Sequence, residues 1–171
     1  MRRLLGPLAL FLASPALADP IGATKTVSIV TDPLGNLSPR GVPGAVIEYR
    51  IVLTNPASNA TLPVRNMIYE DQLPSGVKLR VADLGVSGSG PVGFTDGEVV
   101  LGIGASGLTV TFAGLGSATD GLDFSDGSSW SYTPVADGDG YDARVRAIRI
   151  KPLTTFKTGG SFTLRYRAQI K

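Results

Sequence analysis

The sequence predicts an all-β protein built as an antiparallel β-sandwich. Residues 45–54 and 162–171 alternate strictly between apolar and polar side chains, which is the pattern of strands with one buried face. Several further short segments are rich in β-branched and aromatic residues and are bounded by Gly, Pro, Asn or Asp. No stretch sustains apolar residues at helical spacing, so little α-helix is expected. An antiparallel β-barrel is the alternative architecture.

The N-terminus carries the three parts of a secretory signal peptide. Arg2-Arg3 gives a basic start, an apolar run follows at 4–12, and Ala16-Leu17-Ala18 fits the small-residue cleavage site. The apolar run is too short to span a bilayer, and no later run is longer, so no transmembrane segment is expected. We expect residues 1–18 to be removed on export and residues 19–171 to form one domain. The expected location is extracellular or at the cell surface, with the periplasm as the alternative.

The remaining strands are expected in order along the exported chain. Their ranges are 24–31, 64–69, 77–84, 98–103, 108–113, 130–133 and 144–151. The last of these changes phase, because Val145 and Ala147 are followed by Ile148 and Ile150. A one-residue shift of this kind predicts a β-bulge, unless the small Ala147 simply lies on the other face.

The two strictly alternating strands define the expected core. Their apolar positions should face one shared interior, because side chains two apart lie on the same side of a strand. The predicted core residues are Ile47, Tyr49, Ile51, Leu53, Phe162, Leu164, Tyr166 and Ile170.

Composition excludes several kinds of chemistry. The chain contains neither cysteine nor histidine, so disulfides, thiolate nucleophiles, Cys-ligated metals and imidazole general bases are absent. Residues 102–107 match the dinucleotide-binding pattern G-x-G-x-x-G, but a strand-like segment follows where that mechanism needs a helix. A glycine-rich turn is the better interpretation. We therefore expect a protein that is not an enzyme and has no catalytic residues.

Acidic, glycine-rich loops are the only candidate metal site. Asp137, Asp139 and Asp142 lie within six residues of one another, and Ca²⁺ prefers carboxylate oxygens. The EF-hand spacing is not met, since Tyr141 stands at its fifth position and Ile148 at its twelfth. Solvated Asp-Gly turns are the alternative interpretation.

Charges are segregated along the chain. Nine acidic residues and no basic ones lie between Arg80 and Arg144, and eight basic residues and no acidic ones lie from Arg144 to Lys171. Without Arg2-Arg3 the acidic and basic residues balance, so nucleic acid is not an expected partner. Two interpretations are open. The acidic loops fold back onto basic strands of the same domain, or the acidic end of one copy meets the basic face of another.

Two motifs look like the signature of a known family. Val42–Asn55 and the turn Glu70-Asp71-Gln72-Leu73-Pro74-Ser75-Gly76-Val77, with its D-x-L-P-x-G form, resemble the opening of the bacterial conserved repeat domain (domain of unknown function eleven). Residues 142–150 and 160–170 resemble its closing strands. The resemblance implies an immunoglobulin-like β-sandwich in exported surface or envelope proteins, without catalytic residues. The chain holds one copy only, which sets it apart from the long repetitive members.

The sequence thus predicts a structural or adhesive module of the cell envelope, whose partners are itself or other envelope proteins. The alternative is a binding module for glycan or another envelope component, in which Trp130, Tyr132 and Tyr141 form an aromatic platform. The two hypotheses differ in what they require. A platform needs the three rings exposed on one face, whereas a structural role leaves them packed in the core or in turns.

Overall fold

The computed structural model describes residues 18–60, 62, 64–97 and 104–171. In these residues the chain forms β-strands and a single 3-10 turn, Ala57–Asn59, so the prediction of an all-β protein is confirmed. The strand expected at 98–103 and the signal peptide, apart from Ala18, lie outside the described residues. The described part of the chain holds no helix with the length and apolar character needed to cross a membrane.

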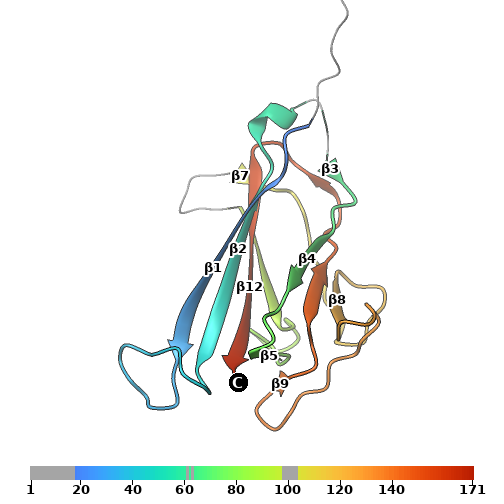
Figure 1. Cartoon of the computed structure of the whole chain (residues 1–171). Coiled ribbons are helices and arrows are strands. Elements are labelled where there is room, and N and C mark those ends of the chain that lie inside the picture. The colour runs from blue at the N-terminus through green and yellow to red at the C-terminus, as the bar shows by residue number, and fades with distance from the viewer. Residues whose placement is uncertain (1–17, 61, 63, 98–103) are drawn as a thin grey trace, which may run out of the picture.

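The larger sheet is organised around the last strand, β12 (Gly160–Ile170). On one side β12 pairs with β2 (Val46–Thr54), which pairs with β1 (Gly22–Thr31) at the edge of the sheet (Figure 1). On its other side, shorter strands follow one another along β12. These are β7 (Gly104–Ala105), β6 (Val92–Asp96) and β5 (Val77–Arg80), with β9 (Tyr141–Asp142) beyond β5. All of these pairs are antiparallel except the short contact of β12 with β7.

The opposing layer is smaller and interrupted. Its main sheet has the order β4 (Tyr69–Gln72), β10 (Ala147–Ile150) and β8 (Leu122–Ser125). The pair β3 (Val64–Arg65) and β11 (Thr155–Phe156) lies further along the same two chain segments. Asn66 and Thr154 separate the pairs and have positive φ angles of 51° and 75°, which a strand does not accommodate. The single strand expected at 64–69 is therefore split in two.

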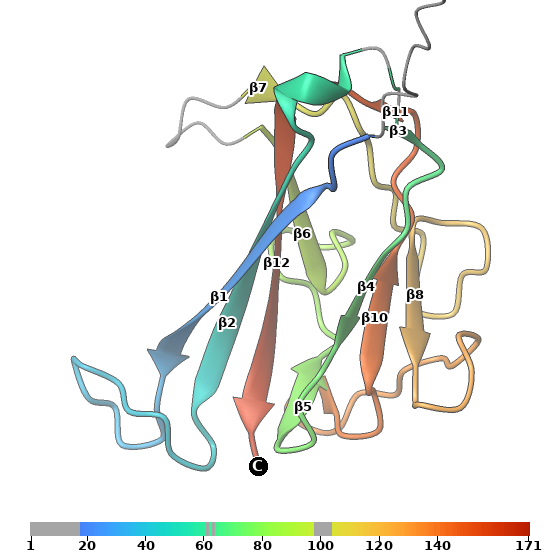
Figure 2. The same cartoon turned by 45° about the horizontal axis from the view of Figure 1, so that its top comes forward.

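The two layers face each other across one hydrophobic core (Figure 2). Of the eight predicted core residues, all but Ile170 are buried, and Ile170 packs against the core at the end of β12. The small layer contributes Phe124, Ile148 and Ile150. None of the described sheets closes on itself, so the sandwich prediction is confirmed and the barrel alternative is wrong.

The phase change in segment 144–151 is a bulge at the start of β10. Val145 and Ile148 both lie in the core, although an unbroken strand would place them on opposite faces. The amide of Arg146 donates to the carbonyl of Ser125 at 2.7 Å, while Ala147 is the Cα partner of the same Ser125. Two residues of one segment therefore oppose one residue of the other, as in a β-bulge.

Two predicted strands are loops instead. Segment 108–113 makes only an isolated bridge, between Thr109 and Leu153, and segment 130–133 lies in and after a turn. In segment 108–113 the Asp120 side chain accepts a backbone amide, that of Ala113, which a strand would have bonded. Just before segment 130–133, Asp126 accepts the amides of Ser128 and Ser129 and fixes a turn. Such side-chain bonds stabilise turns in competition with strands.

Candidate functional site

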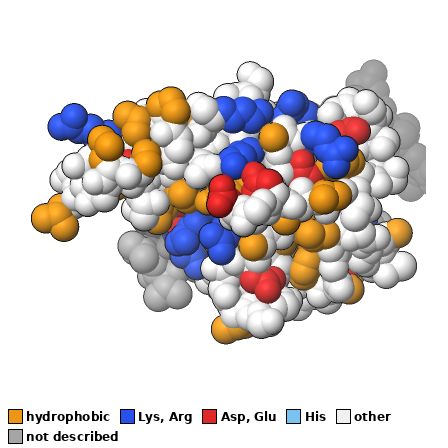
Figure 3. Space-filling view, turned by 90° about the horizontal axis from the view of Figure 1, so that it is seen from below, with side chains coloured by type: hydrophobic (Ala, Val, Ile, Leu, Met, Phe, Trp, Pro, Cys, Tyr) orange, Lys and Arg blue, Asp and Glu red, His pale blue; other side chains and the backbone are white. Residues whose placement is uncertain are grey.

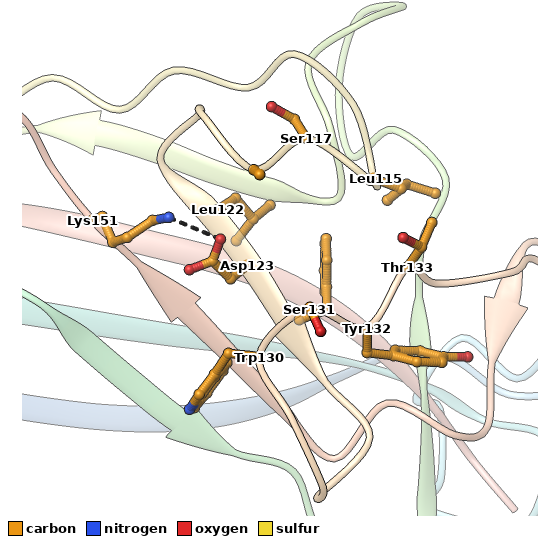
Figure 4. A pocket seen from close by; sticks show the side chains of 12 residues that line it. Leu115, Ser117, Leu122, Asp123, Trp130, Ser131, Tyr132, Thr133 and Lys151 are labelled. Carbon is orange, nitrogen blue, oxygen red and sulfur yellow. Dashed lines mark hydrogen bonds and ion pairs between the residues drawn. The ribbon is translucent and has the colours of Figure 1, made fainter.

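A pocket of about 310 Å³ lies at the outer edge of β8. Asp123 comes from β8 and Lys151 follows β10, while the loop after β8 contributes Trp130 and Tyr132 (Figure 4). The loop 115–118 completes the lining. The ammonium of Lys151 donates to the Asp123 carboxylate at 2.8 Å, so the pocket wall carries a donor and an acceptor side by side.

Trp130, the only tryptophan of the sequence, packs against the guanidinium of Arg149 and is not part of the hydrophobic core. The guanidinium of Arg149 lies 4.0 Å from the centre of the indole, a cation–π contact. Arg149 is fixed in turn by Glu70, at 2.9 Å, and by Asp123, at 3.6 Å, its neighbours on β4 and β8. The guanidinium covers one face of the ring, so the pocket meets the other face or the edge.

Tyr132 is anchored by a buried carboxylate. Its hydroxyl donates to Asp142 at 2.6 Å, and the amides of Val135 and Arg144 donate to the same carboxylate at 2.8 Å. Burial acts to raise the pKa of Asp142, but these three hydrogen bonds outweigh it, so the pKa lies below its ordinary value. Asp142 is therefore a structural anion that holds the loop carrying the two pocket aromatics.

Tyr141 does not join the other two aromatic residues. It is buried on β9 beneath the ammonium of Lys78, which lies 5.1 Å from its ring centre. The structure thus brings two of the three predicted platform rings together, at the pocket, and places the third elsewhere.

Two of the three candidate calcium ligands, Asp137 and Asp142, form hydrogen bonds within the domain through their carboxylates. Asp137 pairs with Lys78 at 2.8 Å and accepts the amides of Asp139 and Tyr141. The hydrogen bond from Lys78, followed by those amides, lowers the pKa of Asp137 to about 2. Asp142 faces Tyr132, as described above. Among the described residues, no group of three carboxylates has the arrangement needed to hold a metal ion.

The segregated charges pair within the domain in part. Of the acidic segment, Asp123 meets Arg149 and Lys151, and Asp142 lies 3.9 Å from Arg144. Arg165 and Arg167 of β12 meet Glu48 of β2, which lies outside the acidic segment, at 3.8 and 3.0 Å. The face seen in Figure 3 accordingly shows basic and acidic side chains interspersed. Asp123 and Asp142 therefore follow the first interpretation, in which acidic and basic segments of one domain meet each other.

An open strand edge is the feature that sequence reasoning missed. Nine of the ten residues of β1 are exposed, and among the described residues β1 has a neighbouring strand on one side only. Val27 and Ile29 are exposed although their partners on β2, Tyr49 and Ile47, are buried. A faint signal was present, since the apolar positions of β1 are fewer than those of β2.

Asp71 marks the boundary between the closed interior and this open side. Its carboxylate accepts the Tyr166 hydroxyl from inside the core at 2.7 Å and the Lys25 ammonium from β1 at 2.7 Å. Burial, then the hydrogen bond to Asp71, raises the pKa of Tyr166 far above its ordinary value, so its hydroxyl stays protonated. The Lys25–Asp71 pair thus joins β1 of one layer to β4 of the other.

Comparisons with protein-family models, with curated proteins and with solved structures found no match to the chain. The resemblance to the conserved repeat domain therefore stays a prediction.

Proposed function

We propose that the protein is an exported structural or adhesive module of the bacterial envelope that associates with a second copy of itself through the edge of β1. The observation that carries the proposal is the open edge described above. The leader-like N-terminus and the resemblance at 42–55 and 70–77 support an envelope location. The lack of cysteine and histidine supports a role without catalysis.

The edge lacks the features that normally prevent strands from pairing. Natural edge strands are short, charged or interrupted by proline. β1 has ten residues and no internal proline, and its one charged residue, Lys25, is already paired with Asp71. Its register with β2 shifts between Ile29 and Thr31, so the irregularity is confined to one end. The remaining stretch presents regular backbone donors and acceptors.

The loop after β1 extends this surface. Leu34 and Leu37 are exposed, and with Val27 and Ile29 they make up half of the large exposed hydrophobic residues in the described part of the chain. The loop is held in shape by Asp32, whose carboxylate accepts hydrogen bonds from the backbone or side chain of Asn36, Arg40 and Leu34. A surface fixed before contact loses less entropy on association.

A second copy is the occupant we propose, because the edge is compatible with itself. Two β1 strands can pair antiparallel about a two-fold axis, and no unpaired charge on the strand opposes its copy. Val27 and Ile29 of each copy would then lie next to the same residues of the other.

Sedimentation velocity over a concentration series tests the proposal, with residues 1–18 removed. We expect concentration-dependent association that persists as salt rises, since backbone and apolar contacts are not screened. The double variant Val27→Lys/Ile29→Lys places like charges across the interface and should be monomeric. The matched control Val86→Lys/Val135→Lys removes comparable exposed apolar surface elsewhere and should associate like the parent.

A parent protein that stays monomeric at its highest soluble concentration contradicts the proposal. Association that rising salt dissolves, or that Val27→Lys/Ile29→Lys retains, contradicts it as well, and the first of these results would favour contact between the acidic end of one copy and the basic face of another.

A further inference from the structure

We propose that the pocket at the edge of β8 is a binding site for a single pyranose ring. The inference is independent of the association through β1, because it concerns a different surface and rests on the pocket's own chemistry. Its volume of about 310 Å³ lies at the small end of ligand sites, which fits one sugar ring rather than a chain or a lipid.

Trp130 is the first reason. An indole that serves the core is buried in it, whereas Trp130 is only half-buried and is not a member of the hydrophobic core. Arg149 fixes its orientation from one side, at 4.0 Å from the ring centre. A rigid ring with a free face or edge in a small pocket suits the apolar C–H face of a pyranose, because aromatic rings offer large flat contact at little entropic cost.

The polar lining is the second reason. Asp123 and Lys151 place an acceptor and a donor 2.8 Å apart, and both are partly exposed to the pocket. Neighbouring sugar hydroxyls each donate and accept, so a carboxylate beside an ammonium matches a pair of them. The hydroxyls of Ser117, Ser131 and Thr133 add weaker, adaptable partners around the pocket (Figure 4).

The same lining disfavours other ligands. An inorganic anion would meet an ammonium already neutralised by Asp123. A cation would find Asp123 as the sole carboxylate among the described lining residues. A purely apolar ligand would cover the partly exposed ion pair without forming a hydrogen bond to it.

Intrinsic fluorescence provides a direct test, because Trp130 is the only tryptophan. Purified protein is titrated with the methyl glycosides of glucose, galactose, mannose and N-acetylglucosamine, and separately with inorganic phosphate. We expect a saturable change with at least one glycoside, with a dissociation constant in the millimolar range that suits so small a ligand, and none with phosphate.

Three variants separate the pocket from the rest of the fold. Asp123→Asn should weaken binding by about tenfold or more, because a hydrogen bond to a charged group is lost. Asp137→Asn is its matched control, since Asp137 also pairs with a lysine at 2.8 Å but lies outside the pocket, and it should bind like the parent. Ala118→Phe introduces a large side chain into the pocket lining at an exposed position and should abolish binding.

The absence of a saturable change with every glycoside overturns the proposal. Unchanged titration in Ala118→Phe overturns it as well, since the fluorescence would then report a different surface. Saturation by phosphate but by none of the glycosides would identify an anion site instead.

Discussion

β1 and β2 are neighbours in one sheet, yet their side chains have opposite environments. Tyr49 and Ile47 of β2 are 8% and 6% exposed, whereas their partners on β1, Val27 and Ile29, are 58% and 38% exposed. The main sheet of the opposing layer ends at β4, and the ion pair between Lys25 and Asp71 connects β4 to β1. Alternation along a strand therefore predicts which side chains share a face, while burial depends on whether another layer covers that face.

Leu164→Ala should produce the largest effect in this comparison. Leu164 is fully buried on β12 between β2 and β6, so truncation removes apolar contacts and leaves a cavity. We expect a loss of about 2–5 kcal/mol in the free energy of unfolding, measured by urea denaturation. A nearly neutral result would show that the core does not extend across β12.

Tyr166→Phe should have an intermediate effect on stability. Together with Lys25→Met, it compares the two side chains that donate hydrogen bonds to Asp71. Loss of the buried hydrogen bond to a charged group should cost about 1.5–3 kcal/mol. Lys25→Met removes the partner from the open side, where the lysine side chain is 31% exposed, and should cost about 1 kcal/mol or less. Equal costs in the two variants would mean that β1 is as well covered as β12.

The dependence of stability on alkaline pH should differ between the parent protein and Tyr166→Phe. The folded pKa of Tyr166 is raised, chiefly by burial, so the unfolded chain loses the proton first as pH rises through about 10. The stability contributed by this residue is complete below that pH and is lost above it. The parent should therefore lose stability more steeply between about pH 9.5 and 11 than Tyr166→Phe does. Identical slopes in chemical denaturation would contradict the buried, protonated hydroxyl.

Val27→Ala should have the smallest effect. In the monomer the Val27 side chain is largely exposed and has few buried contacts to lose, so the change in the free energy of unfolding should stay within about 0.5 kcal/mol. Denaturation at a concentration where the protein is monomeric is the relevant measurement. A cost comparable to that of Leu164→Ala would show that the inner face of β1 is packed after all.

Much of the fold was predictable from local pattern. The strands at 45–54 and 162–171 were recognised by strict alternation, and the bulge near Ala147 by a change of phase. The prediction of strands at 108–113 and 130–133 was wrong, because the β-branched and aromatic residues of these segments lack a continuous partner strand. Strand pairing is a long-range property, and sequence propensity does not report it.

The candidate site was only partly predictable. Aromatic residues near acidic loops pointed to Trp130 and Tyr132, but not to the Lys151–Asp123 pair, whose members lie 28 residues apart in sequence. The charge segregation was visible in the sequence, while its pairing within one domain depends on which strands become neighbours. The open edge of β1 depends on the extent of the opposing layer, which no local pattern records.

Amide hydrogen exchange at two protein concentrations tests directly whether β1 is the association surface. Exchange should slow at the higher concentration for amides of β1, because pairing with a second copy shields its open edge. Amides of β12, which already has neighbours on both sides, should be unaffected. If exchange in β1 is the same at low and high concentration while the protein associates, the association uses another surface and the proposed β1 interface is wrong.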